Sequence, residues 1–94
     1  MKNRILVVDD EEKMRKLLDM TLGGDFEIMA AASAKEAVVL VTSKSPDLVL
    51  TDIKMPGEDG LQLLKRIKEI DSDIPVILMT GHGDKALAIE AIQG

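Results

Sequence analysis

The sequence lacks cysteine altogether, and Phe26 is its only aromatic residue. Without cysteine the chain cannot form a disulfide or use thiolate chemistry, which fits a reducing compartment. With a single aromatic side chain it has few stacking platforms of the kind that bind single-stranded nucleic acids. The formal net charge of −5 also opposes contact with phosphate backbones. We therefore expect no direct nucleic-acid binding by this segment.

Long hydrophobic runs are also missing from the sequence. The longest apolar runs, such as residues 37–41, fall far short of the ~20 residues that a membrane-spanning helix needs. The amino terminus, "MKNRILVVDD", starts basic but reaches an acidic pair where a signal peptide would continue apolar. We therefore expect a cytoplasmic domain with no membrane partner.

What the sequence does contain is aliphatic: 46% of its 94 residues are hydrophobic. Four short apolar runs, each bounded by polar or turn residues, predict strands at residues 5–8, 26–31, 48–51 and 75–79. Three sets of apolar residues at helical spacing predict the intervening helices: Met14, Leu17, Leu18 and Leu22; Ala34, Ala37, Val38 and Val41; Leu63, Leu64, Ile67 and Ile70. An alanine-rich segment at 85–92 predicts a fourth helix. This strand–helix alternation predicts one α/β domain over residues 1–94, with a parallel sheet covered by helices on both faces.

Local signals mark where the helices begin and end. Ser33 with Glu36, and Asp59 with Gln62, have the spacing of capping boxes at helix amino termini. The pair of glycines at 23–24 is expected to stop the first helix, and Pro46 ends the second helical unit. The methionines are expected mainly to fill gaps in the core.

Chemistry-bearing side chains stand where the predicted strands end. Asp9 and Asp10 follow the first strand, Asp52 follows the third and Thr80 follows the fourth. In an open parallel sheet, ligands bind outside the carboxyl ends of the strands, where the strand order reverses. If the first and third strands are neighbours, three carboxylates converge there and repel one another unless a cation neutralises them. Mg²⁺, which prefers a few carboxylates, a carbonyl and retained waters, suits such a site.

Three stretches carry a resemblance to a known family. "ILVVDDE", "DLVLTDIKMPGEDG" and "PVILMTGHGD" are similar to the receiver domain of bacterial two-component response regulators, and the likeness covers all 94 residues in order. The resemblance implies a flavodoxin-like, doubly wound parallel sheet of order 2-1-3-4-5. It also implies that Asp52 is phosphorylated by a phosphohistidine of a sensor histidine kinase. Such a domain is a regulatory phosphoacceptor rather than an enzyme.

The resemblance also assigns roles around Asp52. Asp9 and Asp10 match the acidic pair that binds Mg²⁺, together with Asp52 and the backbone carbonyl of Lys54. Thr80 matches the hydroxyl that moves toward the phosphoryl group. The stretch "TGHGDKALAIEAIQG" is similar to receivers of the nitrogen-regulator and dicarboxylate-transport-regulator type. Those usually precede an ATPase domain that activates sigma-N RNA polymerase and a DNA-binding domain.

One part of the family pattern is missing from residues 1–94. Receivers normally continue through a fifth strand that ends in Lys-Pro, and then a fifth helix. We therefore expect a C-terminally truncated receiver with sheet order 2-1-3-4 and a low yield of phosphorylation. The fourth strand, at 75–79, would then form an exposed aliphatic edge. This edge predicts self-association, as a homodimer that uses the fourth strand and fourth helix.

Several alternatives stand beside the receiver interpretation. A phosphohydrolase of the haloacid dehalogenase type would place its nucleophile after the first strand, with a second acid two positions on. In this chain that position is Glu11, and Asp52 after the third strand would go unexplained. A flavodoxin-like cofactor binder would need a phosphate-binding loop in place of "DDEEKMRK". A non-phosphorylated pseudo-receiver, or dimerisation fragment, would only bind partners; the acidic triad argues against it, whereas the missing fifth strand argues for it. Any single strand-end Asp could merely cap a helix, and His82, between two glycines, is expected to be a loop residue.

Overall fold

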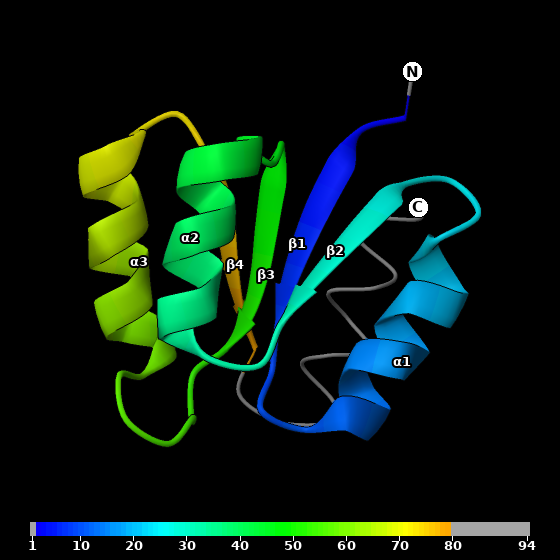
Figure 1. The fold of residues 1–94 in the computed structure, drawn as a ribbon, viewed down its shortest axis with the longest axis horizontal. Helices are drawn as coiled ribbons and strands as arrows, with labels where there is room; N and C mark the ends of the chain where they lie inside the picture. The colour runs from blue at the N-terminus through cyan, green and yellow to red at the C-terminus, as the bar shows by residue number, and fades with distance from the viewer. Residues whose placement is uncertain (1, 80–94) are drawn as a thin grey trace.

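A computed structural model describes residues 2–79 of the chain. Strands and helices alternate along it, as predicted (Figure 1). The elements are β1 (Arg4–Val8), α1 (Glu12–Leu22), β2 (Glu27–Ala31), α2 (Ala34–Lys44), β3 (Leu48–Asp52), α3 (Gly60–Ile70) and β4 (Val76–Met79). Each predicted strand is found to within a residue at either end. The predicted helix at 85–92, Thr80 and His82 lie outside the described residues.

The four strands form one parallel sheet in the order β2-β1-β3-β4. This confirms the predicted order of the first four strands. Val8, the last residue of β1, pairs with Ala31 of β2 on one side and with Thr51 of β3 on the other. Asp52 pairs in turn with Met79, the last residue of β4. The carboxyl ends of all four strands therefore lie level and form what is called the carboxyl edge of the sheet. The carboxyl ends of β1 and β3 are adjacent there.

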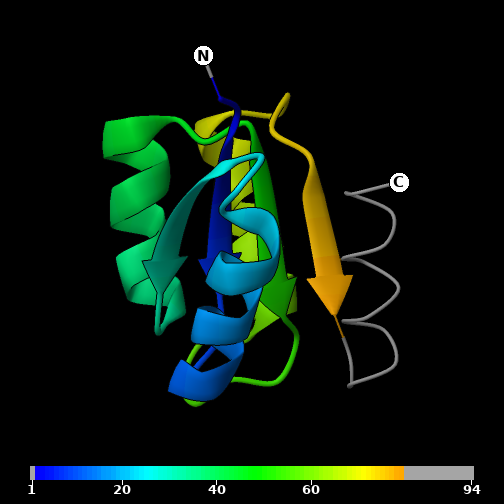
Figure 2. The same ribbon diagram turned by 90° about the vertical axis from the view of Figure 1, so that its right-hand side faces the viewer.

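Among the described residues, α2 and α3 cover one face of the sheet and α1 covers the other (Figures 1 and 2). Alternate residues of a strand point to opposite faces, so β1 contributes to both cores. On the α2 and α3 side, the buried cluster comprises Leu6, Val8, Ala31, Ala34, Ala37, Val41, Val49, Met55, Leu63, Ile67 and Ile74. On the α1 side it comprises Ile5, Val7, Met14, Leu18, Leu22, Leu50 and Met79. The loops that carry the polar residues lie at the carboxyl edge of the sheet, outside both cores.

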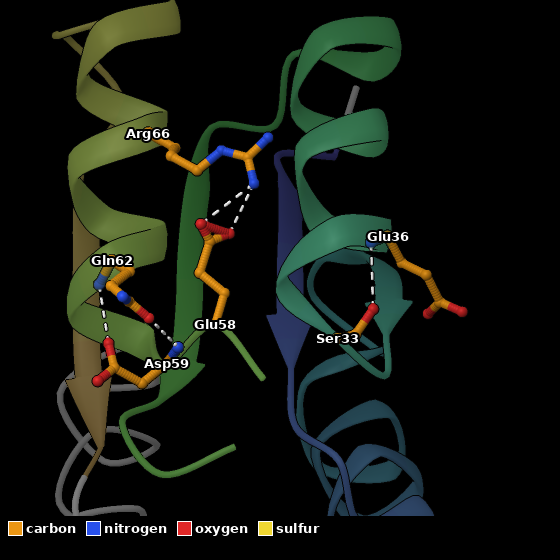
Figure 3. Close-up of polar contacts among 6 residues, drawn as sticks. All are labelled: Ser33, Glu36, Glu58, Asp59, Gln62 and Arg66. Atoms are coloured by element: carbon orange, nitrogen blue, oxygen red, sulfur yellow. Dashed lines mark hydrogen bonds and ion pairs between the residues drawn. The ribbon is translucent and has the colours of Figure 1, made fainter. Parts of the chain in front are cut away.

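The two predicted capping boxes form to different extents (Figure 3). At α3, Asp59 accepts a hydrogen bond from Gln62 N and Gln62 Oε1 accepts one from Asp59 N, both at 2.9 Å. At α2, Ser33 Oγ accepts from Glu36 N at 3.2 Å. The Glu36 carboxylate accepts instead from the backbone N–H of Ala32, one residue before the cap. The α2 box is therefore incomplete, because Glu36 reaches past the capping residue.

Two residues of the apolar patterns that predicted the helices are exposed. Leu17 on α1 is 48% exposed and Ile70 at the end of α3 is 43% exposed. On α1 the buried residues follow a single stripe, Met14, Leu18 and Leu22, because only one side of the helix meets the sheet. The apolar spacing therefore predicted both helices, but not which of their apolar residues are buried. Met20 is 83% exposed, unlike the buried Met14, Met55 and Met79.

Candidate functional site

Three carboxylates converge at the carboxyl edge of the sheet. One oxygen each from Asp9, Asp10 and Asp52 lies within 4.8 Å of the other two. Asp9 is fully buried, Asp52 is 8% exposed and Asp10 is exposed. An all-oxygen set of this charge, with one side open to solvent, fits a hard divalent cation such as Mg²⁺. The expected convergence follows from the pairing of β1 with β3.

Asp9 is fixed from two neighbouring elements. Its backbone N–H continues the sheet by donating to Ala31 O of β2, at 3.1 Å. Its Oδ1 accepts from Glu11 N at 3.0 Å, and its carbonyl accepts from Arg15 Nη1 at 2.7 Å. Arg15 lies on α1, so the helix holds the loop from which the acidic pair projects. This arginine was not foreseen from the sequence, although it follows Asp10 by little more than one helical turn.

Asp52 is the last residue of β3, and its side chain lies on the α1 side of the sheet because strand residues alternate. The next residue, Ile53, donates its N–H to Met79 O of β4 at 3.0 Å, so the strand pairing continues past Asp52. A rigid, paired strand end therefore carries this carboxylate. Of the other predicted site residues, Thr80 lies outside the described residues, and the Lys54 carbonyl stays a predicted metal ligand.

The loop after Asp52 is a braced turn beside the acidic cluster. Residues 53–57 and Asp59 line an open hollow of about 620 Å³. Gly57 has φ +78°, a left-handed conformation that favours glycine. Glu58 accepts two hydrogen bonds from Arg66 Nη1 of α3, at 2.6 and 3.1 Å (Figure 3). Met55 is buried in the core between the sheet and α3, whereas Lys54 is exposed.

The family profile for the response regulator receiver domain matches residues 5–94. The chain belongs to this family. The membership covers nearly the whole sequence and agrees with the sheet order and with the three acids at the strand ends. It decides against the haloacid dehalogenase and flavodoxin-like cofactor-binding alternatives.

Similar proteins include regulators and a phosphotransferase. C4-dicarboxylate transport transcriptional regulatory protein DctD of Rhizobium meliloti is 41% identical over 90 residues, which is 95% of this chain and 20% of that protein. Sporulation initiation phosphotransferase F of Bacillus subtilis is 44% identical over 85 residues, 89% of this chain and 68% of that protein. The chain thus spans about a fifth of the length of DctD.

A solved structure shows the same fold in a signalling complex. A chain in the crystal structure of histidine kinase ThkA in complex with response regulator protein TrrA superposes on this one with a TM-score of 0.79. The two are 41% identical, and the match covers 85% of this chain and 70% of that chain. Receiver domains of this family therefore interact with sensor histidine kinases.

Proposed function

We propose that this receiver domain is a phosphoacceptor whose Asp52 takes a phosphoryl group from a phosphohistidine of a sensor histidine kinase. The observation that carries the proposal is the position of Asp52: it ends a buried strand, within 4.8 Å of the two acids that follow the neighbouring strand. A single aspartate that only ends a strand does not require two further acids beside it. Three carboxylates this close together favour a bound cation, because their charges otherwise repel one another.

In the proposed reaction, a carboxylate oxygen of Asp52 forms a bond to phosphorus while the phosphorus–nitrogen bond of the kinase phosphohistidine breaks. The electron pair of that bond returns to the histidine ring. Phosphoryl transfer depends mainly on in-line positioning and on stabilisation of charge, so the paired strand end contributes by holding Asp52 still. Hydrolysis of the resulting acyl phosphate would return the carboxylate and end the signal. Thr80 is proposed to contact the phosphoryl oxygens through its hydroxyl.

Asp9, Asp10, Asp52 and the backbone carbonyl of Lys54 are the proposed ligands of Mg²⁺. When bound, Mg²⁺ would neutralise negative charge on the phosphoryl oxygens and among the three acids. The donor chemistry fits this ion, since carboxylate oxygens dominate and one side of the cluster is open for water and phosphate. The Lys54 side chain is exposed, and we assign it no part in binding the metal.

In the proposed signalling pathway, the receiver domain accepts the signal from a sensor histidine kinase and passes it to an output domain. The likeness to the transcriptional regulatory protein DctD supports regulation of transcription as the output. The resemblance seen in the sequence implies that this output is of the sigma-N-dependent type and acts through a DNA-binding domain elsewhere in a longer protein. We expect the receiver itself to act in the cytoplasm and to contact no nucleic acid. Within residues 2–79, no helix has the length and apolar character to cross a membrane.

Self-association is also proposed for the 94-residue chain. Within the described residues β4 pairs with β3 alone, and Val76, Ile77 and Leu78 are only partly buried. An aliphatic strand edge without charge is prone to pair with a second copy. A two-fold dimer through β4 would satisfy that edge in both copies.

Labelling with acetyl phosphate or a matched kinase tests the proposed function. We expect intact-mass analysis to show one added phosphoryl group on the wild type and none on Asp52→Asn. Asp25→Asn is the matched control, because Asp25 is exposed and lies just before β2, at the opposite end of the parallel strands. Label on Ser45 or His82 instead, or equal label on Asp52→Asn, would refute the assignment. Absence of any label would favour a pseudo-receiver.

The metal proposal has its own measurement. Millimolar Mg²⁺ should raise the melting temperature of the wild type by mass action, because the ion binds the folded state. Asp10→Asn should reduce that rise, whereas Asp25→Asn should keep it. A wild-type melting temperature that does not change when Mg²⁺ is added would argue that the three acids do not bind this ion.

A further inference from the structure

Thr51 is a buried hydroxyl that the proposed reaction does not use. It is fully buried within β3, one residue before Asp52, and its Oγ1 donates to the carbonyl of Asp52 at 3.0 Å. Successive strand residues point to opposite faces of the sheet, so Thr51 faces α2 and α3 while Asp52 faces α1. Thr51 therefore cannot reach the phosphoryl group. Any effect that it has on the site must pass through the backbone.

Gly60, the first residue of α3, packs against the same carbonyl. A Cβ at this position would lie 2.3 Å from Asp52 O and 2.9 Å from Ile53 Cα, far inside any permitted contact. The Gly60 N–H donates to Ile53 O at 2.8 Å. The amino terminus of α3 thus rests directly on the chain that leaves Asp52, and only glycine permits this approach.

The peptide unit between Asp52 and Ile53 is consequently held at both of its poles. Thr51 binds its carbonyl, and Met79 of β4 accepts from its N–H at 3.0 Å. Because a peptide unit is planar, fixing both poles fixes the plane. That plane sets the backbone angle at Asp52 and the direction in which the chain continues toward Lys54.

We infer that Thr51 and Gly60 are positioning residues, which hold the Asp52–Ile53 peptide so that the Asp52 carboxylate and the Lys54 carbonyl share one geometry. The inference rests on the proposed function, in which these two groups bind one cation and Asp52 attacks phosphorus. Loss of the Thr51 hydroxyl lets the peptide rotate, and small misplacements of a reacting group are costly in rate.

Thr51→Val tests this inference, because valine has nearly the shape of threonine but no hydroxyl. Thr51→Ser keeps the hydroxyl and removes only the methyl group. Thr42→Val is the matched control: it removes a threonine hydroxyl that bonds within α2, to Val38 O. Three readouts are needed: hydrogen exchange of the Ile53 amide relative to that of Leu6, the Mg²⁺ dissociation constant from amide shifts, and the labelling rate at saturating Mg²⁺.

We expect Thr51→Val to speed exchange at Ile53 by about tenfold relative to Leu6, the scale of one lost hydrogen bond. We expect the Mg²⁺ dissociation constant to rise by about threefold and the labelling rate to fall by about tenfold. Thr51→Ser should stay within about twofold of the wild type in each readout, and Thr42→Val should change none of them.

Gly60→Ala provides a second, independent change. Its Cβ must displace the Asp52 carbonyl, so we expect larger effects in the same three readouts. Gly24→Ala is the control, because a Cβ there meets no atom within 4 Å. Should Gly60→Ala fail to fold, the Thr51 variants decide.

A purely structural role for Thr51 predicts a different outcome. In that case Thr51→Val would lower the melting temperature, yet the folded protein would keep its Mg²⁺ affinity, its labelling rate and the ratio of Ile53 to Leu6 exchange; this result would overturn the inference. Failure of the proposed function is recognised separately, as a wild type without label on Asp52. The Mg²⁺ affinity and the Ile53 exchange ratio then decide the inference without any phosphorylation.

Discussion

Arg15 and Thr51 each donate a hydrogen bond to the backbone carbonyl of a site aspartate, Asp9 in one case and Asp52 in the other. At the scale of single residues, carboxylates that must stand close together need rigid backbones, because their mutual repulsion would otherwise move them apart. Bonds to the carbonyls meet this need at the backbone rather than at the carboxylate oxygens.

Arg15→Met is predicted to destabilise the domain by about 1.5 kcal/mol, since it removes a charge-assisted hydrogen bond in a partly buried position. Methionine keeps most of the apolar stem, so the loss of stability measures the contribution of the guanidinium group. Lys16→Met is the control: among residues 2–79, Lys16 forms an exposed ion pair with Glu12 on the same helix, at 3.2 Å, and its loss should cost about 0.3 kcal/mol. Urea unfolding monitored by circular dichroism measures both. Equal losses would show that the Arg15 bond contributes little.

At the scale of elements, α3 differs from α2 in what its amino terminus touches. The Asp59–Gln62 capping box is complete, and the residue after Asp59 is Gly60, which rests on the Asp52 carbonyl. The Glu58–Arg66 pair holds the preceding loop to the same helix (Figure 3). The start of α3 therefore contacts the backbone of the site. We expect fraying of this helix end to displace the backbone at Asp52.

Asp59→Ala is predicted to cost about 1 kcal/mol of stability, the usual effect of losing a helix cap. Because α3 braces the peptide after Asp52, the variant should also bind Mg²⁺ more weakly. Ser33→Ala is the matched control at α2, where it removes the Ser33 bond to Glu36 N. It should cost a similar free energy but leave the Mg²⁺ dissociation constant unchanged. Calorimetric titration and urea unfolding give the two quantities; a weakened Mg²⁺ affinity in both variants would reject the coupling.

At the scale of the whole molecule, the two outer strands of the described sheet differ in character. The β2 edge strand carries the exposed Glu27, which pairs with Arg4, whereas β4 has the sequence VILM. Charge at a sheet edge discourages pairing with other chains, and an uncharged aliphatic edge permits it. We therefore expect strand pairing between copies to use β4 rather than β2.

Leu78→Lys on β4 is predicted to shift the 94-residue chain from dimer toward monomer, because lysine at an edge opposes strand pairing. Met29→Lys is the control on β2, also at a partly buried position of an outer strand, and should leave the dimer intact. Sedimentation velocity across micromolar concentrations distinguishes the two. A wild type that is monomeric throughout this range, with protected amides along β4, would contradict self-association.

The sequence by itself determined the elements, their order and the chemistry at the strand ends. Aliphatic runs and helical periodicity are local properties, and turn and capping signals such as Asp59 with Gln62 lie within a few residues of the ends that they set. The acids at 9, 10 and 52 could also be assigned to one edge, since parallel strands place all their carboxyl ends together.

Only the tertiary structure decided which groups meet. The contacts of Arg15 with Asp9 O, and of Gly60 with Asp52 O, depend on how each helix returns to the sheet, which no local pattern encodes. The width of a buried helix face was likewise undetermined: Leu17 follows the apolar spacing of α1 yet is half exposed, because one sheet surface covers only one stripe of that helix. Periodicity gives the direction of a helix face, whereas its extent depends on the surface that packs against it.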